Sequence, residues 1–381
     1  MARLGDVCTI NPRIKTFQDD FMVSFVPMQN VSEEGTVDAS IIKYYGEVKK
    51  GFTYFQENDV LFAKITPCME NGKGGIARNL KNGVAFGSTE FHVLRPNPNF
   101  MISSWLYYLT SWPEFRKECE KNMTGSAGQK RVPKTFLENY EIQLPELDEQ
   151  RKIAAVLDKV SDLIAKRRQQ LDKLDELIKA RFVEMFGDPV SNSLNFPLLS
   201  LPQLGEFGRG VSKHRPRNAP ELLGGKYPLI QTGEVANSEL YISSYENTYS
   251  EFGFKQSKMW KSGTLCITIA ANIAKTAILA FDACFPDSVV GFVANEKTNN
   301  IFIHYWFGFF QQILEAQAPE SAQKNINLKI LSELEVIVPP IELQNHFAAF
   351  VEQTEKIKTT INKSLEKLET LKKALMQEYF G

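Results

Sequence analysis

The chain has 381 residues, and that length suggests two or three domains rather than a single ordinary core. Apolar residues make up 43% of it and charged residues 23%, a globular composition that excludes a chain that is disordered or collagen-like throughout. The formal net charge is −1, so composition alone does not indicate a nucleic-acid-binding protein. Five cysteines without a close pair are typical of reduced thiols, so we expect a cytoplasmic protein without a metal site or cofactor.

Residues 1–144 are expected to form a mixed α+β domain. Short runs of β-branched and aromatic residues, at 23–28, 60–65 and 91–94, are separated by turns rich in glycine and asparagine. One helical segment is expected at 105–119.

Residues 145–187 are expected to form a long helical spacer. Apolar residues recur there in alternating steps of four and three, which is the heptad pattern of a coiled coil. The helix is expected to start after Pro145 and to end at Gly187. The predicted seam contains Leu157, Ile164, Leu171, Leu174 and Ile178.

Residues 188–338 repeat the mixed α+β pattern, with strand-like runs at 227–230, 265–269 and 289–293 and a helical segment at 305–316. The apolar stretch 265–285 carries polar and charged residues, so we expect two buried strands joined by a turn rather than a membrane span. Residues 339–381 are expected to form the distal helical spacer. Its predicted seam contains Val351, Ile361, Leu365, Leu368 and Leu375, and two lysines, Lys358 and Lys372, interrupt it.

The two halves of the chain are copies of one unit of about 190 residues. From residue 129 to residue 187 the sequence matches residues 323–381 at a constant offset of 194, without a gap. Gln150 therefore corresponds to Gln344, and Phe186 to Phe380. Upstream of these segments the match is weaker but keeps the same order.

The repeat predicts how the long helices bury their apolar stripes. An isolated amphipathic rod, here about 50 Å long, needs a partner, and this chain contains two matching stripes. We expect an antiparallel coiled coil with one globular domain near each end, related by a pseudo-twofold axis. Homodimerisation through the same helices is the alternative.

Two segments carry a resemblance to a known family. The run Leu144-Pro-Glu-Leu-Asp-Glu-Gln150, continuing to Phe186-Gly-Asp-Pro189, resembles the central helical region of type I restriction–modification specificity subunits. The tail from Val338 to Gly381 resembles the distal helical region of that family, and the stretches 125–129 and 321–323 resemble the polar loop before each region. The second loop lacks a counterpart of Gly128. The resemblance is specific in the helices and weak in the globules.

This resemblance implies a non-catalytic protein with two target-recognition domains, each reading one half of a split site in double-stranded DNA. It also implies two methyltransferase subunits as partners, with restriction subunits bound through them, and no membrane. The rod length is then expected to set the number of unread base pairs between the half-sites.

Basic and amide side chains beside glycine-containing loops are the candidate DNA contacts, because Lys and Arg neutralise phosphate and Arg, Gln and Asn can read bases. In the first domain these are Lys64, Lys73, Gln129, Lys130, Arg131 and Lys134; in the second they are Arg209, Lys213, Arg215, Arg217, Gln323, Lys324 and Asn325. Ordinary solvated loop charge is the alternative for each of them. Since the domains are nearly neutral, we expect weak DNA binding without partner subunits.

The sequence shows no pattern typical of an enzyme. The run Asn97-Pro-Asn-Phe100 lacks the second proline of an amino-methyltransferase loop, and no phosphate-binding loop, metal-ligand spacing or nucleophile elbow occurs. The alternative interpretation is a coiled-coil scaffold that presents two protein- or ligand-binding globules and does not bind DNA.

Overall fold

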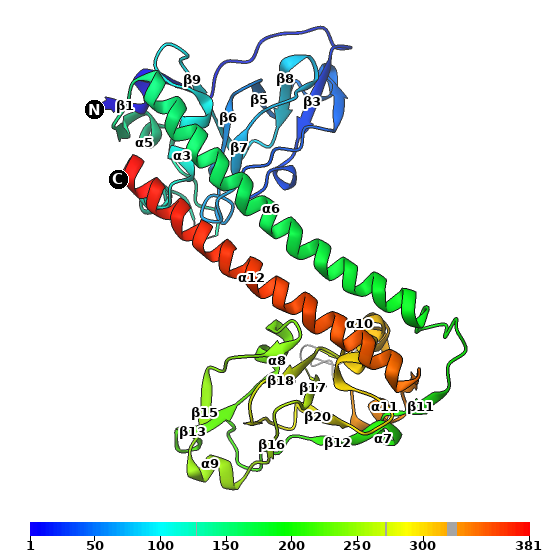
Figure 1. Ribbon diagram of the computed structural model, residues 1–381. Helices are drawn as coiled ribbons and strands as arrows, with labels where there is room; N and C mark the ends of the chain where they lie inside the picture. The colour runs from blue at the N-terminus through cyan, green and yellow to red at the C-terminus, as the bar shows by residue number, and fades with distance from the viewer. Residues whose placement is uncertain (127, 271–272, 318–325) are drawn as a thin grey trace. The chain divides into compact units, whose positions relative to one another are not determined.

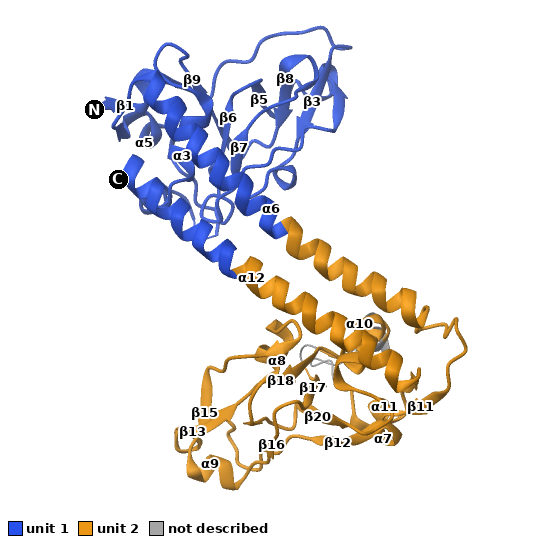
Figure 2. Ribbon diagram, in the orientation of Figure 1, with its two compact units in different colours: residues 1–168, 363–381 blue, residues 169–362 orange. Residues whose placement is uncertain are grey.

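The computed structural model describes residues 1–126, 128–270, 273–317 and 326–381. The candidate residues Gln323, Lys324 and Asn325 lie outside the described residues. The chain divides into two compact units, one made of Met1–Arg168 and Lys363–Gly381 and the other of Gln169–Asn362 (Figure 2). Both boundaries fall at the same position of the repeat, since Arg168 and Asn362 are 194 residues apart.

The first unit contains two four-stranded sheets (Figure 1). One is antiparallel throughout, in the order β2 (Cys8–Ile10), β9 (Phe91–Pro96), β6 (Val60–Ala63), β7 (Gly74–Ile76). The other has the order β4 (Ile42–Tyr44), β3 (Met22–Val26), β8 (Val84–Gly87), β5 (Thr53–Gln56), with β3 and β8 parallel. The short strands β1 (Ala2–Arg3) and β10 (Glu141–Ile142) pair with each other. The helices are α1 (Leu4–Val7), α2 (Tyr45–Val48), α3 (Ser103–Ser111), α4 (Pro113–Lys121) and α5 (Lys134–Asn139).

Strand β6 explains the layering of the first unit. Its four residues are all buried, and alternate side chains point to opposite faces of a strand. Val60 and Phe62 pack in a cluster with α3 and α4, whereas Leu61 and Ala63 pack in a second cluster with residues of β3, β5 and β8. Burial on both faces requires the uninterrupted apolar run of β6.

The single helix predicted at 105–119 is two helices, α3 and α4. Pro113 has no N–H to continue the first helix and disfavours the helical conformation in the preceding residue. Trp112 is accordingly extended, with φ −64° and ψ 129°, and Pro113 starts α4.

The second unit repeats the strand order of the first. Its sheets run β12 (Gly205–Arg209), β20 (Val289–Ala294), β17 (Leu265–Thr268), β18 (Thr276–Leu279), β14 (Tyr241–Ile242), and β15 (Asn247–Tyr249), β13 (Leu223–Leu229), β19 (Ala283–Cys284), β16 (Met259–Trp260). β11 (Leu198–Ser200) pairs with β21 (Glu335–Ile337). The helices are α7 (Leu201–Leu204), α8 (Thr232–Asn237), α9 (Glu251–Lys255), α10 (Asn300–Gln317) and α11 (Leu328–Ser332). Strand β14 has no counterpart among the described strands of the first unit.

The apolar stretch 265–285 forms strands, as predicted. β17 and β18 are antiparallel and fully buried. Within the described part of the chain, no helix combines the length and apolar character that a membrane span requires.

The two long helices, α6 (Leu147–Phe186) and α12 (Ile341–Phe380), have 40 residues each and contribute to both units. In the first unit Ile153 and Leu157 share a core with Met376, and Arg168 pairs with Glu369. In the second, Phe182 and Phe186 pack on Phe347. Residue numbers rise along one helix as they fall along the other, so the helices run antiparallel within each unit. Of the predicted seam residues, Leu157, Ile164, Ile178 and Val351 are buried, whereas Leu171, Leu174, Ile361, Leu365, Leu368 and Leu375 are half-buried.

Equivalent glutamines anchor the starts of both helices. The amide of Gln150 accepts from Ile102 N at 3.0 Å and donates to Phe100 O at 2.7 Å and Pro145 O at 2.8 Å. Its counterpart Gln344 accepts from the Thr298 hydroxyl and donates to Lys297 O and Pro339 O. Both side chains are fully buried, so each amide supplies the hydrogen bonds that these polar groups would otherwise make with water.

Candidate nucleic-acid interface

In the first unit two loops lie side by side. One connects β6 to β7 and spans residues 64–73; the other is the loop segment 128–132, which includes the end of the polar stretch predicted at 125–129. Their backbones are joined by hydrogen bonds from Thr66 N to Lys130 O, at 3.1 Å, and from Val132 N to Lys64 O, at 2.9 Å. This pairing brings four sequence-predicted residues, Lys64, Gln129, Lys130 and Arg131, onto one surface.

Glu90 binds one of these four residues, Arg131. Its carboxylate accepts from Arg131 Nε at 2.9 Å and Nη2 at 2.8 Å, while Arg131 Nη1 donates to Gln129 O at 3.0 Å. The hydrogen bonds from Arg131 hold the pKa of Glu90 below its ordinary value. Burial lowers the pKa of the neighbouring Lys64 despite the attraction of Glu90. Arg131 is thus held in one orientation by the carboxylate and by its own loop.

The other predicted residues of this unit have different surroundings. Lys73 Nζ donates to Met28 O at 3.4 Å, and Lys134 pairs with Glu138 one helical turn further along α5. Gln129 and Lys130 are exposed. A cleft of about 590 Å³ adjoins Lys130, and its lining includes Gly128 and Glu70 and, from α4, Lys117, Glu120 and Lys121.

A buried arginine binds backbone carbonyl groups of the β6–β7 loop, and the sequence analysis did not predict this residue. Arg116 on α4 donates to Met69 O at 2.6 Å and to Gly72 O at 3.0 Å. Burial lowers the pKa of Arg116 to about 10. A single arginine in a short helix gives no sequence signal for this role, because the role depends on how α4 packs under the loop.

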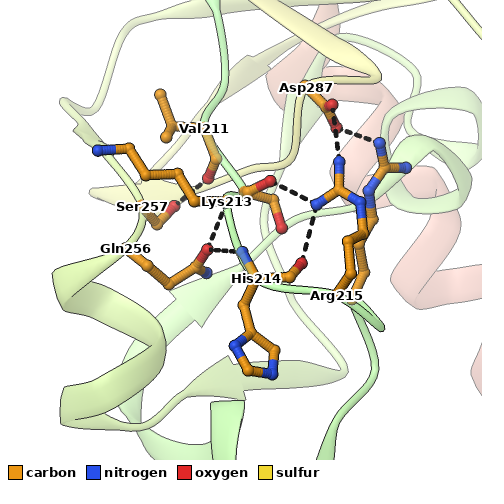
Figure 3. Close-up of polar contacts among 9 residues, drawn as sticks. Val211, Lys213, His214, Arg215, Gln256, Ser257 and Asp287 are labelled. Atoms are coloured by element: carbon orange, nitrogen blue, oxygen red, sulfur yellow. Dashed lines mark hydrogen bonds and ion pairs between the residues drawn. The ribbon is translucent and has the colours of Figure 1, made fainter.

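In the second unit three of the predicted basic residues, Lys213, Arg215 and Arg217, lie on the loop that follows β12. Figure 3 labels the first two. Gln256 Oε1 accepts from the backbone N–H groups of Lys213, at 2.5 Å, and His214, at 2.9 Å. The Ser257 hydroxyl donates to Val211 O at 2.8 Å. The loop backbone is therefore held by side chains from the end of α9, whereas the side chain of Lys213 is exposed.

Asp287 holds the same loop through its arginines (Figure 3). Its carboxylate accepts from Arg217 Nη2 and, at 3.4 Å, from Arg215 Nη2. Arg215 Nη1 also donates to Ser212 O at 2.6 Å and to His214 O at 2.8 Å. Arg209, at the end of β12, is exposed. The structure thus groups Lys213, Arg215 and Arg217, with Arg209 preceding them in the chain.

The first unit has a counterpart of this loop that the sequence analysis missed. Asn11 N donates to Val93 O at 2.8 Å just after β2, and Gly210 N donates to Val289 O at 2.9 Å just after β12. Residues 11–21 therefore correspond to the loop after Gly210. They present exposed Arg13 and Lys15. Strand-by-strand alignment of the two copies would have found them, but the sequence match is too weak there.

A buried histidine links two of these loops. His92 Nε2 lies 2.7 Å from Val132 O, which can only accept, so this nitrogen carries the proton. Nδ1 then accepts from Asn11 Nδ2 at 3.0 Å, and Asn11 Oδ1 accepts from Val93 N, which prevents the amide from reversing. The neutral ring is therefore the form that fits.

We expect this histidine to make the first unit less stable in acid. Burial lowers the pKa of His92 below its ordinary value of 6.5. Its contribution to folding is therefore complete above pH 6.5 and is lost as the pH falls toward the folded-state pKa. Urea unfolding of wild-type and His92→Gln chains between pH 7.5 and 5 checks this, since glutamine keeps a donor and an acceptor but does not titrate. Equal pH slopes for both chains would contradict it.

Comparison with known proteins follows the same division of the chain. The family model for the type I restriction modification DNA specificity domain matches residues 1–176 and again residues 201–372. Two relatives are specificity subunits of type I restriction enzymes from Escherichia coli. The chain is 43% identical over 175 residues to the EcoEI subunit and 38% identical over 214 residues to the EcoAI subunit. These matches cover 45% and 55% of this chain but 29% and 35% of the relatives, so the chain spans about a third of their length.

Two solved structures share the fold over nearly the whole chain. A crystal structure of a type I restriction–modification S subunit from M. genitalium aligns with a TM-score of 0.61 and 13% identity, covering 100% of this chain and 95% of that one. A chain from a study of assembly and conformational transition of the type I restriction–modification system aligns with a TM-score of 0.58 and 17% identity, covering 99% and 96%.

Proposed function

Because the chain belongs to the family of type I restriction–modification DNA specificity domains, we propose that it is the sequence-reading, non-catalytic subunit of such a system. Each unit would read one half of a bipartite site in double-stranded DNA. We expect it to act in the cytoplasm, with methyltransferase subunits bound directly and restriction subunits bound through them.

The observation that carries this proposal is the duplication of the loop-bearing fold. Both units have the same strand order and place basic loops beside the connection into the second strand of the equivalent sheet, β9 or β20. A single DNA reader would need only one such fold. Two equivalent readers on one chain suit a site with two specific halves.

The long helices offer matched surfaces for two identical partners. Leu163 on α6 and its repeat counterpart Ile357 on α12 are exposed by 38% and 47%. Leu177 and its counterpart Leu371 are exposed by 48% and 46%. Each of these residues lies one position before a heptad position of the seam and is itself exposed. The first unit therefore carries Leu163 and Leu371, and the second carries Leu177 and Ile357. Equivalent positions in both halves of the repeat are thus apolar and exposed to solvent. This pattern supports docking of one methyltransferase subunit on each unit.

The deciding experiment maps methyladenine in genomic DNA of cells that carry the methyltransferase, with and without this gene. We expect methylation of a split motif only when the gene is present. The chain alone is expected to bind the motif weakly at physiological salt, because its domains have little net positive charge. Absence of any gene-dependent motif, together with failure to form a complex with the methyltransferase, would favour the scaffold instead.

A further inference from the structure

The two units place one carboxylate in the same connection of the fold. Glu90 lies between β8 and β9, and Asp287 lies between β19 and β20, which occupy the same places in the strand order. Each carboxylate binds arginines of a candidate DNA-contact loop, Arg131 in the first unit and Arg215 with Arg217 in the second. The arginines come from different loops, so the repeated feature is the carboxylate itself.

Arg131 and Arg215 each keep N–H groups that make no hydrogen bond among the described contacts. A guanidinium has five N–H groups. Among the described contacts, Arg131 uses three, two to Glu90 and one to Gln129 O. Arg215 also uses three, two to backbone carbonyls of its loop and one to Asp287. Each guanidinium therefore keeps two N–H groups while its orientation is fixed, although both side chains are about half exposed.

The remaining N–H groups are on Nη1 and Nη2 in Arg131 and on Nε and Nη2 in Arg215. Donors on two neighbouring nitrogens can serve two acceptors on one base edge in the major groove. Guanine presents two adjacent acceptors, N7 and O6, whereas adenine presents an acceptor beside a donor. An arginine that is already oriented loses less conformational freedom when it binds a base. The adjacent carboxylate repels phosphate, and its negative charge offsets the positive charge of the arginine. It therefore weakens sequence-independent binding to the DNA backbone.

We propose that Glu90 and Asp287 are positioning residues that orient Arg131 and Arg215, respectively, to read one guanine in each half-site. This inference rests on the proposed DNA-reading function. It adds which base is recognised and which residues recognise it. Arg217 holds the Asp287 carboxylate from a second side and keeps it in place.

The test uses the full-length chain with its methyltransferase subunits and the variants Glu90→Gln and Asp287→Asn. Each variant keeps the size of the side chain but removes its charge. We expect Glu90→Gln to relax the preference for guanine at one position of one half-site by about tenfold or more, with the other half-site unchanged. Asp287→Asn should do the same in the other half-site, so each variant is the control for the other.

A second measurement separates positioning from a general loss of structure. The freed arginine becomes available to phosphate, so the slope of log affinity against log salt on non-specific DNA should steepen by about one in each variant. Glu90→Asp keeps the negative charge, so it should keep most of the guanine preference that Glu90→Gln loses. A misfolded domain would instead lose all recognition of its half-site without a steeper slope.

Several results would overturn the proposal. One is a wild-type motif without guanine in either half-site; another is an unchanged base preference in both variants. Relaxation spread evenly over all positions would also contradict it. If a gene-dependent split motif persists in any of these cases, the DNA-reading function stands and only the positioning role fails. If no motif depends on the gene, the proposed function itself fails.

Discussion

Replacing Lys358 by alanine is expected to destabilise the second unit by about 3 kcal/mol. The lysine side chain is only 3% exposed, in the middle of α12. Its ammonium group lies 2.8 Å from Asp175 Oδ1 on α6 and 3.1 Å from Glu355 Oε1, and it also pairs with Glu239. Burial by itself lowers the pKa of Lys358, but these carboxylates raise it above its ordinary value. Alanine would leave three like charges together and an unfilled space.

The magnitude is at the lower end for a buried ion pair because two of the carboxylates, Asp175 and Glu239, remain substantially exposed and screened. Hydrogen exchange along residues 341–362, compared with residues 363–381 as an internal control, measures the effect within one chain. Lys358→Met should recover the packing but not the charge, and adding Asp175→Asn and Glu355→Gln to it should recover further stability. Equal protection of residues 341–362 in wild-type and Lys358→Ala chains would contradict the prediction.

A glutamate at both Leu163 and Ile357 is expected to weaken methyltransferase binding at each site by about 30-fold or more. A central interface residue contributes 2 kcal/mol or more, and each 1.4 kcal/mol is a factor of ten in affinity. These two residues are repeat counterparts and are solvent-exposed, so the charge should not disturb the folded chain. Light scattering of the co-expressed complex and calorimetric titration with the purified methyltransferase measure the loss.

The matched control is Val183→Glu. Val183 is also an exposed apolar residue of α6, at 42%, but its repeat counterpart is the polar residue Gln377. A surface that binds two copies of one partner should use positions that are apolar in both halves, so this variant should bind normally. Single Leu163→Glu and Ile357→Glu chains should each retain one methyltransferase. Normal binding by the double variant, or an equal loss in the control, would place the docking surface elsewhere.

The interrupted seam of the distal helix shows how the structure modifies a periodic pattern. The heptad pattern alone marks Lys358 and Lys372 as defects, at positions where α6 has Ile164 and Ile178. Lys358 is instead surrounded by carboxylates. Burial lowers the pKa of Lys372, and its ammonium group lies 5.9 Å from the ring centre of Tyr108. Periodicity identifies which positions face the partner helix, but it does not reveal the polar groups that neighbouring segments supply.

The repeat, the two long helices, the mixed α+β globules and the family were all determined by the sequence alone. Heptad spacing is local, and a constant offset of 194 over the final segments needs no folding information. Only the tertiary structure decided which charges face one another: Glu90 and Arg131 are 41 residues apart, and Asp287 and Arg215 are 72 apart. Such pairs depend on strand order and loop path, because no short-range period connects residues that meet only when distant strands hydrogen-bond into one sheet.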